Sequence, residues 1–239
     1  MKIIKDTKRH DKLCQLCVES ANSLLSSLKT ETKELLNQSM VCVDYSKGDI
    51  IYAEGNMPVA LMSLVEGKVK IFKFGVGTRQ QIVRMATPIG FIGHRGFFAD
   101  EPHIASAEAI EPSVVCRINS LMVNEIVRAN PDFAMNIIRA LATDLGFSHR
   151  RTVTLTQKHI RGRLADTLFM LGDIYGFEHD GATLKVCLTR EDLANLSNMT
   201  TSNAIRTLSN FATEGHVELK GKQIKLTNTK ALEEIGSCS

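Results

Sequence analysis

The sequence predicts an α+β protein in which a β-roll, a long helix and a winged helix-turn-helix follow one another along the chain. Short apolar runs punctuated by glycine occupy residues 41–118 of the 239 residues, a texture typical of many short strands. A heptad pattern then runs through residues 133–158, and two short amphipathic segments and an alternating segment end the chain. We expect three domains: an N-terminal segment with the β-roll in 1–130, a dimerisation helix in 131–158 and the helix-turn-helix in 159–239.

The composition is that of a globular protein without a membrane span. The chain is 44% hydrophobic and 23% charged. It contains no run of the roughly 18 uncharged apolar residues that a spanning helix needs. Charges in the opening MKIIKDTKRHDK occupy the place where a signal peptide has its apolar core. We therefore expect a cytoplasmic protein with no membrane partner. The net charge of +3 neither requires nor excludes a polyanionic partner.

The β-roll is predicted from glycines that separate short apolar runs. Glycines separate the runs VCVDY, DIIYA, ALMSLV, KVKIFKF, QIVRM and VVCRI, and β-branched residues alternate in KVKIF. This spacing favours antiparallel strands that close into a barrel or a double-sheet jelly roll. The glycines are most simply explained by turns with positive φ between strands.

A helix-helix seam is predicted for the middle of the chain. Residues 120–128 suit a short helix, and a longer one follows Asn130-Pro131-Asp132. In the longer helix, residues recur at alternating steps of three and four, as expected where two helices pair side by side. The predicted seam consists of Ile138, Leu141, Leu145, Ser148, Thr152 and Leu155. Homodimerisation is the interpretation we favour, and a single helix lying on its own domain is the alternative.

The end of the chain predicts a helix-turn-helix with a wing. A helix over 160–176 ends at Gly176, and a short strand TLKVCLT follows a polar loop. Two short helices, REDLANLSN and TSNAIRTLSNFATEG, are then joined by a tight turn. The residues expected to pack between them are Leu193, Leu196, Ile205, Leu208 and Phe211. The alternating segment HVELKGKQIKLTN predicts a hairpin with lysines at its tip, which is the wing.

The second of these helices carries side chains suited to the major groove of DNA. Arginine bonds guanine O6 and N7 in bidentate fashion, and asparagine or serine bonds adenine or phosphate. Thr200 is placed to cap the helix and to contact a phosphate. The hairpin lysines would contact the backbone without reading sequence. The candidate DNA-contacting residues are Thr200, Thr201, Ser202, Asn203, Arg206, Lys220 and Lys222. For each of them taken alone, a solvated surface is the alternative.

The order of parts and several motifs resemble the Crp/Fnr family, named for the cyclic AMP receptor protein and the fumarate-nitrate reduction regulator. The motifs are KGDIIYAEG, LVEGKVKIF, HIRGRLADTLFML and LTREDLANLSNMTTSNAIRTLSNFATEGHVELKGKQIKL, and the resemblance covers nearly the whole chain. It implies a cyclic-nucleotide-binding-like β-roll in a homodimeric transcription regulator that binds a two-fold symmetric site in double-stranded DNA. Arg206 matches the family's guanine-reading arginine, whereas Ser202 replaces its usual glutamate. We also expect RNA polymerase as a partner.

An enzyme is not expected, because the chain has no nucleophile-base arrangement, P-loop or dinucleotide fingerprint. The alternative from another class is a stand-alone ligand-binding protein with no role on DNA.

The resemblance locates an effector pocket in the β-roll and argues against cyclic AMP in its usual mode. Family members that bind cyclic AMP hold its ribose with a Gly-Glu pair and its phosphate with an Arg-Ser pair. Here Gly93-His94 and Ile104-Ala105 occupy those positions. The phosphate would lose charge-assisted hydrogen bonds worth about 1.5–3 kcal/mol each. We therefore expect another effector or a redox signal. The candidate pocket residues are Gly93, His94, Arg95, Ile104 and Ala105. His94, Arg95 and His103 would suit another anion or a haem, or they are surface residues.

The cysteines leave three interpretations open. The six are Cys14, Cys17, Cys42, Cys116, Cys187 and Cys238, and their scatter favours thiols or a metal centre over disulfides. Oxygen-sensing family members hold a [4Fe–4S] cluster, and the resemblance maps its ligands onto Cys14, Cys17 and Cys116, with Ser23 in place of the fourth. Cys42 is interpreted as a plain core cysteine. The open alternatives are a metal or cluster site, a redox pair of Cys14 and Cys17, and no cysteine role.

Overall fold

The structure is a computed structural model that describes residues 2–237 of the chain. It divides into two compact units, Met1–Lys73 with Val83–Leu145, and Phe74–Ile82 with Gly146–Ser239. No helix within the described range is both long enough and apolar enough to cross a membrane. Cys238 lies outside the described residues.

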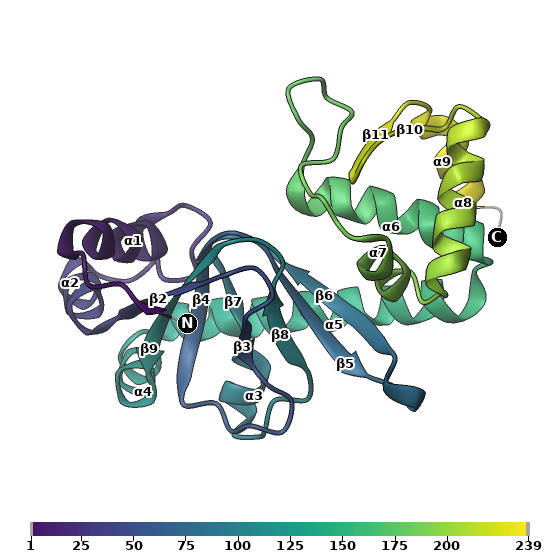
Figure 1. Ribbon diagram of the computed structural model, residues 1–239. Helices are drawn as coiled ribbons and strands as arrows, with labels where there is room; N and C mark the ends of the chain where they lie inside the picture. Colours follow the sequence, from purple (N-terminus) through teal and green to yellow (C-terminus); the bar gives the residue numbers. More distant parts are fainter. Residues whose placement is uncertain (1, 238–239) are drawn as a thin grey trace. The chain divides into compact units, whose positions relative to one another are not determined.

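The predicted β-roll is built from two antiparallel sheets (Figure 1) and lies in the first unit, apart from residues Phe74–Ile82, which belong to the second. The five-stranded sheet has the order β1 (Lys2–Ile3), β2 (Val41–Tyr45), β9 (Ser113–Asn119), β4 (Ala60–Glu66) and β7 (Gly90–Ile92). The four-stranded sheet has the order β3 (Ile50–Tyr52), β8 (Ser106–Ala109), β5 (Val69–Phe74) and β6 (Gln80–Ala86), with a 3₁₀ turn η1 (Val76–Thr78) between its last two strands. Gly67 lies in the turn between β4 and β5 and has a φ of +88. This left-handed conformation favours glycine, as predicted for the turns between strands.

The five-stranded sheet is covered on both faces, which explains why β4 is buried along nearly its whole length. Successive side chains of a strand point to opposite faces. Accordingly Leu61 and Val65 pack in a core under the helices, whereas Met62 and Leu64 pack in the core shared with the other sheet. The same alternation turns Cys42 of β2 toward the helices.

Helices absent from the sequence prediction cover the outer face of this sheet. They are α1 (Thr7–Glu19) and α2 (Thr30–Ser39), and both contact β9 (Figure 1). Asp6 caps α1, because its carboxylate accepts from the amides of Lys8 and Arg9 at 3.0 and 3.3 Å. A third helix missing from the prediction, α3 (His94–Ala99), follows Gly93 in the glycine-rich block. The short helix expected over 120–128 is α4 (Ser120–Ala129).

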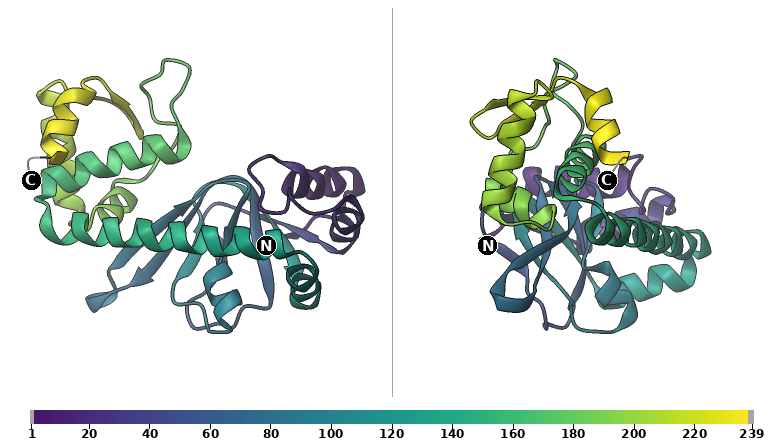
Figure 2. Two further views of the ribbon diagram at one scale, coloured as in Figure 1. Left: turned by 180° about the vertical axis from the view of Figure 1, so that it is seen from behind. Right: turned by 90° about the vertical axis from the view of Figure 1, so that its right-hand side faces the viewer.

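The long helix α5 (Pro131–Gln157) is continuous over 27 residues, close to the range that the heptad pattern predicts (Figure 2). Proline at its first position costs no hydrogen bond, since the first amides of a helix have no partner within it. Phe133 and Ile137 on its first turns are buried in the core under the helices.

The second unit contains the predicted helix-turn-helix and wing (Figure 2). Its elements after α5 are α6 (Ile160–Tyr175), α7 (Arg190–Leu196), α8 (Thr201–Thr213), β10 (Val217–Lys220), β11 (Gln223–Leu226) and α9 (Thr229–Ser237). The strand expected in TLKVCLT is reduced to isolated bridges, Phe177 to Leu184 and Thr183 to Lys225. The terminal helix α9 was not predicted. It packs on α6, and that contact buries Leu232 and gives a short segment its stability.

Candidate functional site

The two helices of the helix-turn-helix pack through a small apolar core. Leu193 on α7 is 1% exposed, and Leu208 and Phe211 on α8 are equally buried. Each helix begins at a threonine cap, which satisfies amides that have no partner within the helix. The hydroxyl of Thr189 accepts from the Asp192 amide at 2.9 Å, and that of Thr200 accepts from the Asn203 amide at 3.2 Å. The position of α8 therefore follows from its own sequence signals and this core.

One prediction about that core is wrong. Ile205 was expected to pack between the helices, but it is 47% exposed. The buried stripe of α8 consists of Ala204, Thr207, Leu208 and Phe211, which recur at the three- and four-residue steps of one helical face. Ile205 is one residue, or about 100°, away from that stripe. The steps between Ala204, Leu208 and Phe211 are the sequence signal that identifies the correct face.

The exposed surface of α8 carries the candidate DNA-contacting side chains. Thr201, Ser202 and Arg206 are exposed, and Asn203 is half-buried. The Arg206 guanidinium donates from Nη2 to Asn203 Oδ1 at 2.9 Å. Asn203 therefore restricts the rotamers of Arg206 before any partner binds. Ile205 belongs to the same exposed surface and adds an apolar side chain that the sequence analysis did not include.

The wing brings the two candidate lysines to one tip. Strands β10 and β11 pair from Val217–Leu226 to Lys220–Gln223. Gly221 turns the chain at φ +60, and Lys220 and Lys222 are exposed on either side of it. Arg190 at the start of α7 donates to the Gly221 carbonyl at 2.9 Å, which ties the tip of the wing to the helix-turn-helix.

An arginine outside the helix-turn-helix supports the end of α8. Arg161 on α6 donates to both carboxylate oxygens of Glu214, at 2.9 and 2.5 Å, and its guanidinium stacks 4.9 Å from the Phe211 ring centre. A paired, stacked guanidinium makes both an ion pair and apolar contact. The bonds from Arg161 hold the pKa of Glu214 below its usual value. No pattern in the sequence identifies this role of Arg161.

The five candidate effector residues lie together in the first unit. Gly93, His94, Arg95, Ile104 and Ala105 line one cavity of ≈ 190 Å³. The residues of this cavity that the sequence analysis did not assign to it are Tyr52, Ile71, Val83, Arg84, Gly96, His103 and Asp144. The predicted pocket is thus one continuous cavity, and part of its wall comes from strands and a helix distant in sequence.

Charged groups in this cavity are paired with one another. Asp144 of α5 lies 2.8 Å from Arg84 and 3.3 Å from the buried His94 ring. Burial opposes ionisation of Asp144, but the hydrogen bond from His94 and the charge of Arg84 hold its pKa below the usual value. Arg95 pairs with Glu101 at 2.5 Å. Both arginines of the cavity wall therefore already have carboxylate partners.

The cavity does not reproduce the phosphate-binding pair. Ile104 and Ala105 stand at the positions of the arginine and the serine, and neither side chain donates a hydrogen bond. On the opposite wall, Tyr52 and His103 stack with their ring centres 4.0 Å apart.

Burial of His103 predicts a pH-dependent stability of the first unit. His103 is 5% exposed, and burial lowers its pKa below the usual 6.5. Below pH 6.5 the unfolded chain binds the proton more readily than the folded one, so stability is lost as the pH falls through the window between the two pKa values. In the wild-type protein the free energy of unfolding should fall as the pH is lowered from 7.5 to 5. In His103→Phe the slope of this fall should be smaller, by at most about 1.4 kcal/mol per pH unit. Urea titrations of both proteins across this range measure it, and parallel profiles would contradict it.

The cysteines are arranged differently from the prediction. Cys42 and Cys116 form a disulfide, although thiols were expected and Cys42 was interpreted as a plain core cysteine. The two face each other directly in the pairing of β2 with β9, across 74 residues of sequence. Of the described cysteines, Cys14, Cys17 and Cys187 are free. The disulfide depends on the register between two strands that are far apart in sequence and adjacent in the sheet. The spacing of the cysteines along the chain does not reveal that register.

The four-ligand set that the resemblance implies for a [4Fe–4S] cluster does not fit. Ser23, at the fourth position, donates its hydroxyl to the Cys17 carbonyl at 2.5 Å and accepts from the Leu25 amide at 3.1 Å. It serves the turn after α1. Cys116 is bonded to Cys42, and the Cys17 thiol contacts Ser63. An iron–sulfur cluster needs thiolates converging on one volume, and this set does not converge.

Burial also makes the two N-terminal thiols poor nucleophiles. It raises the pKa of Cys14 to about 12 and that of Cys17 to about 11. The reactive form of cysteine is the thiolate. The Cys14–Cys17 redox pair therefore has no support from thiol acidity, and both residues are free in the structure.

Two family models match the chain at the places where these sites lie. The cyclic nucleotide-binding domain matches residues 42–130, and the Crp-like helix-turn-helix domain matches residues 162–235. The chain belongs to the Crp/Fnr family of transcription regulators. Members of the Crp/Fnr family are regulators with a DNA-binding helix-turn-helix, not enzymes.

Relatives and solved structures agree with this assignment. A CRP-like cAMP-activated global transcriptional regulator of Mycobacterium tuberculosis is 25% identical over 82% of this chain and 88% of that protein. The fumarate and nitrate reduction regulatory protein of Vibrio cholerae is 24% identical over 81% of this chain and 77% of that protein. The structure of FixK2 from Bradyrhizobium japonicum has the same fold, with a TM-score of 0.75 at 21% identity over 84% of this chain and 98% of its own.

Proposed function

We propose that this Crp/Fnr-family chain is a cytoplasmic, homodimeric regulator that binds a two-fold symmetric DNA site, with affinity controlled from the β-roll by a signal other than cyclic AMP in its usual mode. In this proposal residues 1–130 sense the signal, residues 131–158 form the dimer and residues 159–239 bind DNA. RNA polymerase is the partner through which the bound dimer acts on transcription.

The observation that carries the proposal is the exposed surface of α8. A recognition helix enters the major groove with the N-terminal half of one face exposed. Here that half carries Ser202, Arg206 and the apolar Ile205, while Leu208 and Phe211 hold the opposite face. Arg206 suits guanine O6 and N7, and Asn203 orients it from 2.9 Å away. Ile205 suits the methyl group of thymine, which is the apolar feature of the groove.

The proposal is tested by letting the protein select its own site. Full-length protein is incubated with a random duplex pool, bound duplexes are amplified over several rounds, and the selected site is mapped by footprinting. We expect two inverted half-sites whose centres lie about 10–10.5 base pairs, or one helical turn, apart. A pool that shows no enriched sequence, or an enriched sequence without symmetry, would refute the proposal.

The wing lysines are expected to add affinity without sequence preference. Each phosphate contact contributes about 0.9 to the slope of log K against log salt. A dimer carries two copies of Lys222, so Lys222→Ala is expected to make the slope shallower by about 2, and equally for selected and random duplexes. Titrations at several salt concentrations measure both slopes. Lys47→Ala, which removes an exposed charge of the β-roll, is the matched control and should leave the slopes unchanged.

Exposed apolar residues on α5 support the dimer. Ile138 and Leu145 of the predicted seam are 57% and 58% exposed, and Ser148 and Thr152 are also exposed. Leu141 and Leu155 are half-buried, Leu141 against the core of its own unit. Met135 and Val153 add further exposed apolar surface to the helix. A second copy of α5 would cover side chains that the isolated chain leaves in water.

A charge at the centre of this surface is expected to separate the dimer. Leu145→Asp would place a carboxylate against its own symmetry mate in an apolar seam, which is strongly unfavourable. Sedimentation should shift from dimer to monomer, and affinity for the two-fold site should fall by about 100-fold or more, because one half-site then binds alone. Leu121→Asp, at an exposed leucine of α4, is the control and should leave the dimer intact. A dimeric Leu145→Asp protein would disprove this interface.

The paired charges around the β-roll cavity support an effector other than a cyclic nucleotide. Neither arginine of the wall is free to meet a phosphate, since Arg84 bonds Asp144 and Arg95 bonds Glu101. Asp144 lies on α5, so a ligand that breaks its pair with Arg84 or His94 would act directly on the proposed dimerisation helix. Asp144 therefore connects the cavity to α5, the helix that would control the affinity of the dimer for DNA.

A further inference from the structure

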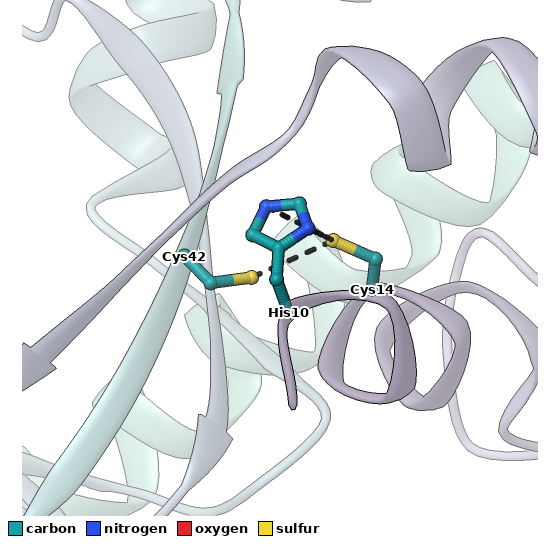
Figure 3. A group of neighbouring side chains, drawn as sticks. All are labelled: His10, Cys14 and Cys42. Atoms are coloured by element: carbon teal, nitrogen blue, oxygen red, sulfur yellow. Dashed lines mark hydrogen bonds between the residues drawn. The ribbon is translucent and has the colours of Figure 1, made fainter. Parts of the chain in front are cut away.

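A histidine nitrogen and two sulfur atoms from distant parts of the chain converge beneath α1. The donor atoms of His10, Cys14 and Cys42 all lie within 4.8 Å of one another (Figure 3). Cys116 lies outside this group of three, but its sulfur is bonded to that of Cys42 and is therefore the neighbouring thiol once the disulfide is reduced. His10 and Cys14 come from one face of α1, and the two other cysteines come from neighbouring strands of the sheet below it.

The separations match those of ligands around one tetrahedral ion. Zinc lies about 2.3 Å from cysteine sulfur and about 2.0–2.1 Å from histidine nitrogen, which puts tetrahedral ligands roughly 3.5–3.8 Å apart. Cys14 Sγ lies 3.6 Å from Cys42 Sγ and 3.7 Å from both ring nitrogens of His10. Cys14 Sγ is therefore already at ligand spacing from both partners, and His10 and Cys42 lie within 4.8 Å of each other.

The histidine is held as a metal ligand usually is. His10 Nε2 lies 3.0 Å from the Met40 carbonyl, and since a carbonyl only accepts, Nε2 carries the proton. Nδ1 then presents its lone pair, and a backbone carbonyl on the other ring nitrogen is the common outer partner of a metal-bound histidine. The Asp11 carboxylate lies 3.6 Å from Nδ1, which is too far for a hydrogen bond.

We propose that the reduced protein binds one zinc-class divalent ion through His10, Cys14, Cys42 and Cys116, and that the Cys42–Cys116 disulfide closes this site. An external dithiol opens it: the dithiol is oxidised to its own disulfide, and Cys42 and Cys116 each receive one electron and one proton as thiols. Binding of the ion then displaces the protons of the three thiols to solvent. Three thiolates and one imidazole form a closed site of the structural type.

This ligand set differs from the cysteine set that an iron–sulfur cluster would require. It uses His10 and Cys42, and it leaves Cys17 and Ser23 out. The ion would fasten α1 to the strands β2 and β9 in place of the disulfide between those strands. The oxidised first unit is linked at this position by the Cys42–Cys116 disulfide, and the reduced one by the bound ion. The redox state selects between the two links.

The test uses full-length protein and cobalt as a spectroscopic substitute for zinc. One sample is left oxidised, and another is reduced anaerobically with a dithiol that is then removed by gel filtration. We expect about one cobalt per chain in the reduced sample, with the absorption of tetrahedral thiolate-bound cobalt, and close to none in the oxidised one. Zinc should displace the cobalt. Equal binding by the two samples, or iron and inorganic sulfide in anaerobically purified protein, would overturn the proposal.

Variants distinguish the four ligands from neighbouring thiols. His10→Gln, Cys14→Ser and Cys116→Ala should each weaken binding by more than about 100-fold, since loss of an outer partner alone costs 10–100-fold. Cys17→Ala is the matched control, because Cys17 is a buried thiol on the same helix outside the cluster, and it should bind like wild type. His10 is partly exposed, so His10→Gln keeps the fold testable, and its melting curve without metal should match wild type. Wild-type affinity in His10→Gln and Cys14→Ser would overturn the site.

Discussion

Arg206→Ala is expected to lower affinity for the selected DNA site by about 30-fold to 10⁴-fold. A bidentate arginine–guanine pair is worth about 1–3 kcal/mol of discrimination, and each half-site of a dimer loses one such pair. The combined loss of about 2–6 kcal/mol converts to this range, because each 1.4 kcal/mol is tenfold. Affinity for a random duplex should change far less, since it depends on phosphate contacts. The specificity ratio therefore falls almost as much as the specific affinity.

The measurement is fluorescence anisotropy at one fixed salt concentration, with the selected duplex and a scrambled duplex of the same length. Arg128→Ala is the matched control, because it removes one exposed positive charge from α4 and leaves α8 unaltered. Its specificity ratio should equal that of wild type. If Arg206→Ala retained the wild-type ratio, α8 would not read bases through Arg206.

Phe211→Ala is expected to destabilise the second unit by about 3–5 kcal/mol, the usual cost of deleting a buried phenylalanine ring. Phe211 is 0% exposed between the helices of the helix-turn-helix. The truncation leaves a cavity and also removes the ring on which Arg161 stacks at 4.9 Å. Because α8 loses its support, specific DNA binding should weaken together with stability.

Urea titration followed by circular dichroism measures the loss, and the two units are expected to show separate transitions. DNA binding is then measured at a temperature at which the variant remains folded. Phe74→Ala is the control in the same unit, since Phe74 is 50% exposed and its ring has less surface to lose from the core. An unchanged transition in Phe211→Ala would show that this core does not stabilise the unit.

The elements that the sequence predicted well are those with local signals. The cap at Thr200, the buried positions of Leu208 and Phe211 on α8 and the alternation of the wing all lie within a few residues, and the structure contains each of them. The helices α1, α2 and α9 were missed although Asp6 caps α1, because short helices take most of their stability from packing on a sheet or another helix, which the sequence does not display. Ile205 was assigned to the wrong face because it lies three residues before Leu208, whereas the buried stripe continues through Ala204, four residues before Leu208.

The sequence by itself determined the order of the domains, the family and the candidate residues of α8, the wing and the β-roll cavity. Helical period, strand alternation and capping act over one or two turns of chain, so they can be read from neighbouring residues. Only the tertiary structure decided that Cys42 pairs with Cys116, that Asp144 enters the cavity and that His10 and Cys14 meet that disulfide. These contacts join residues tens of positions apart, and they depend on strand register and helix docking, which no local pattern encodes.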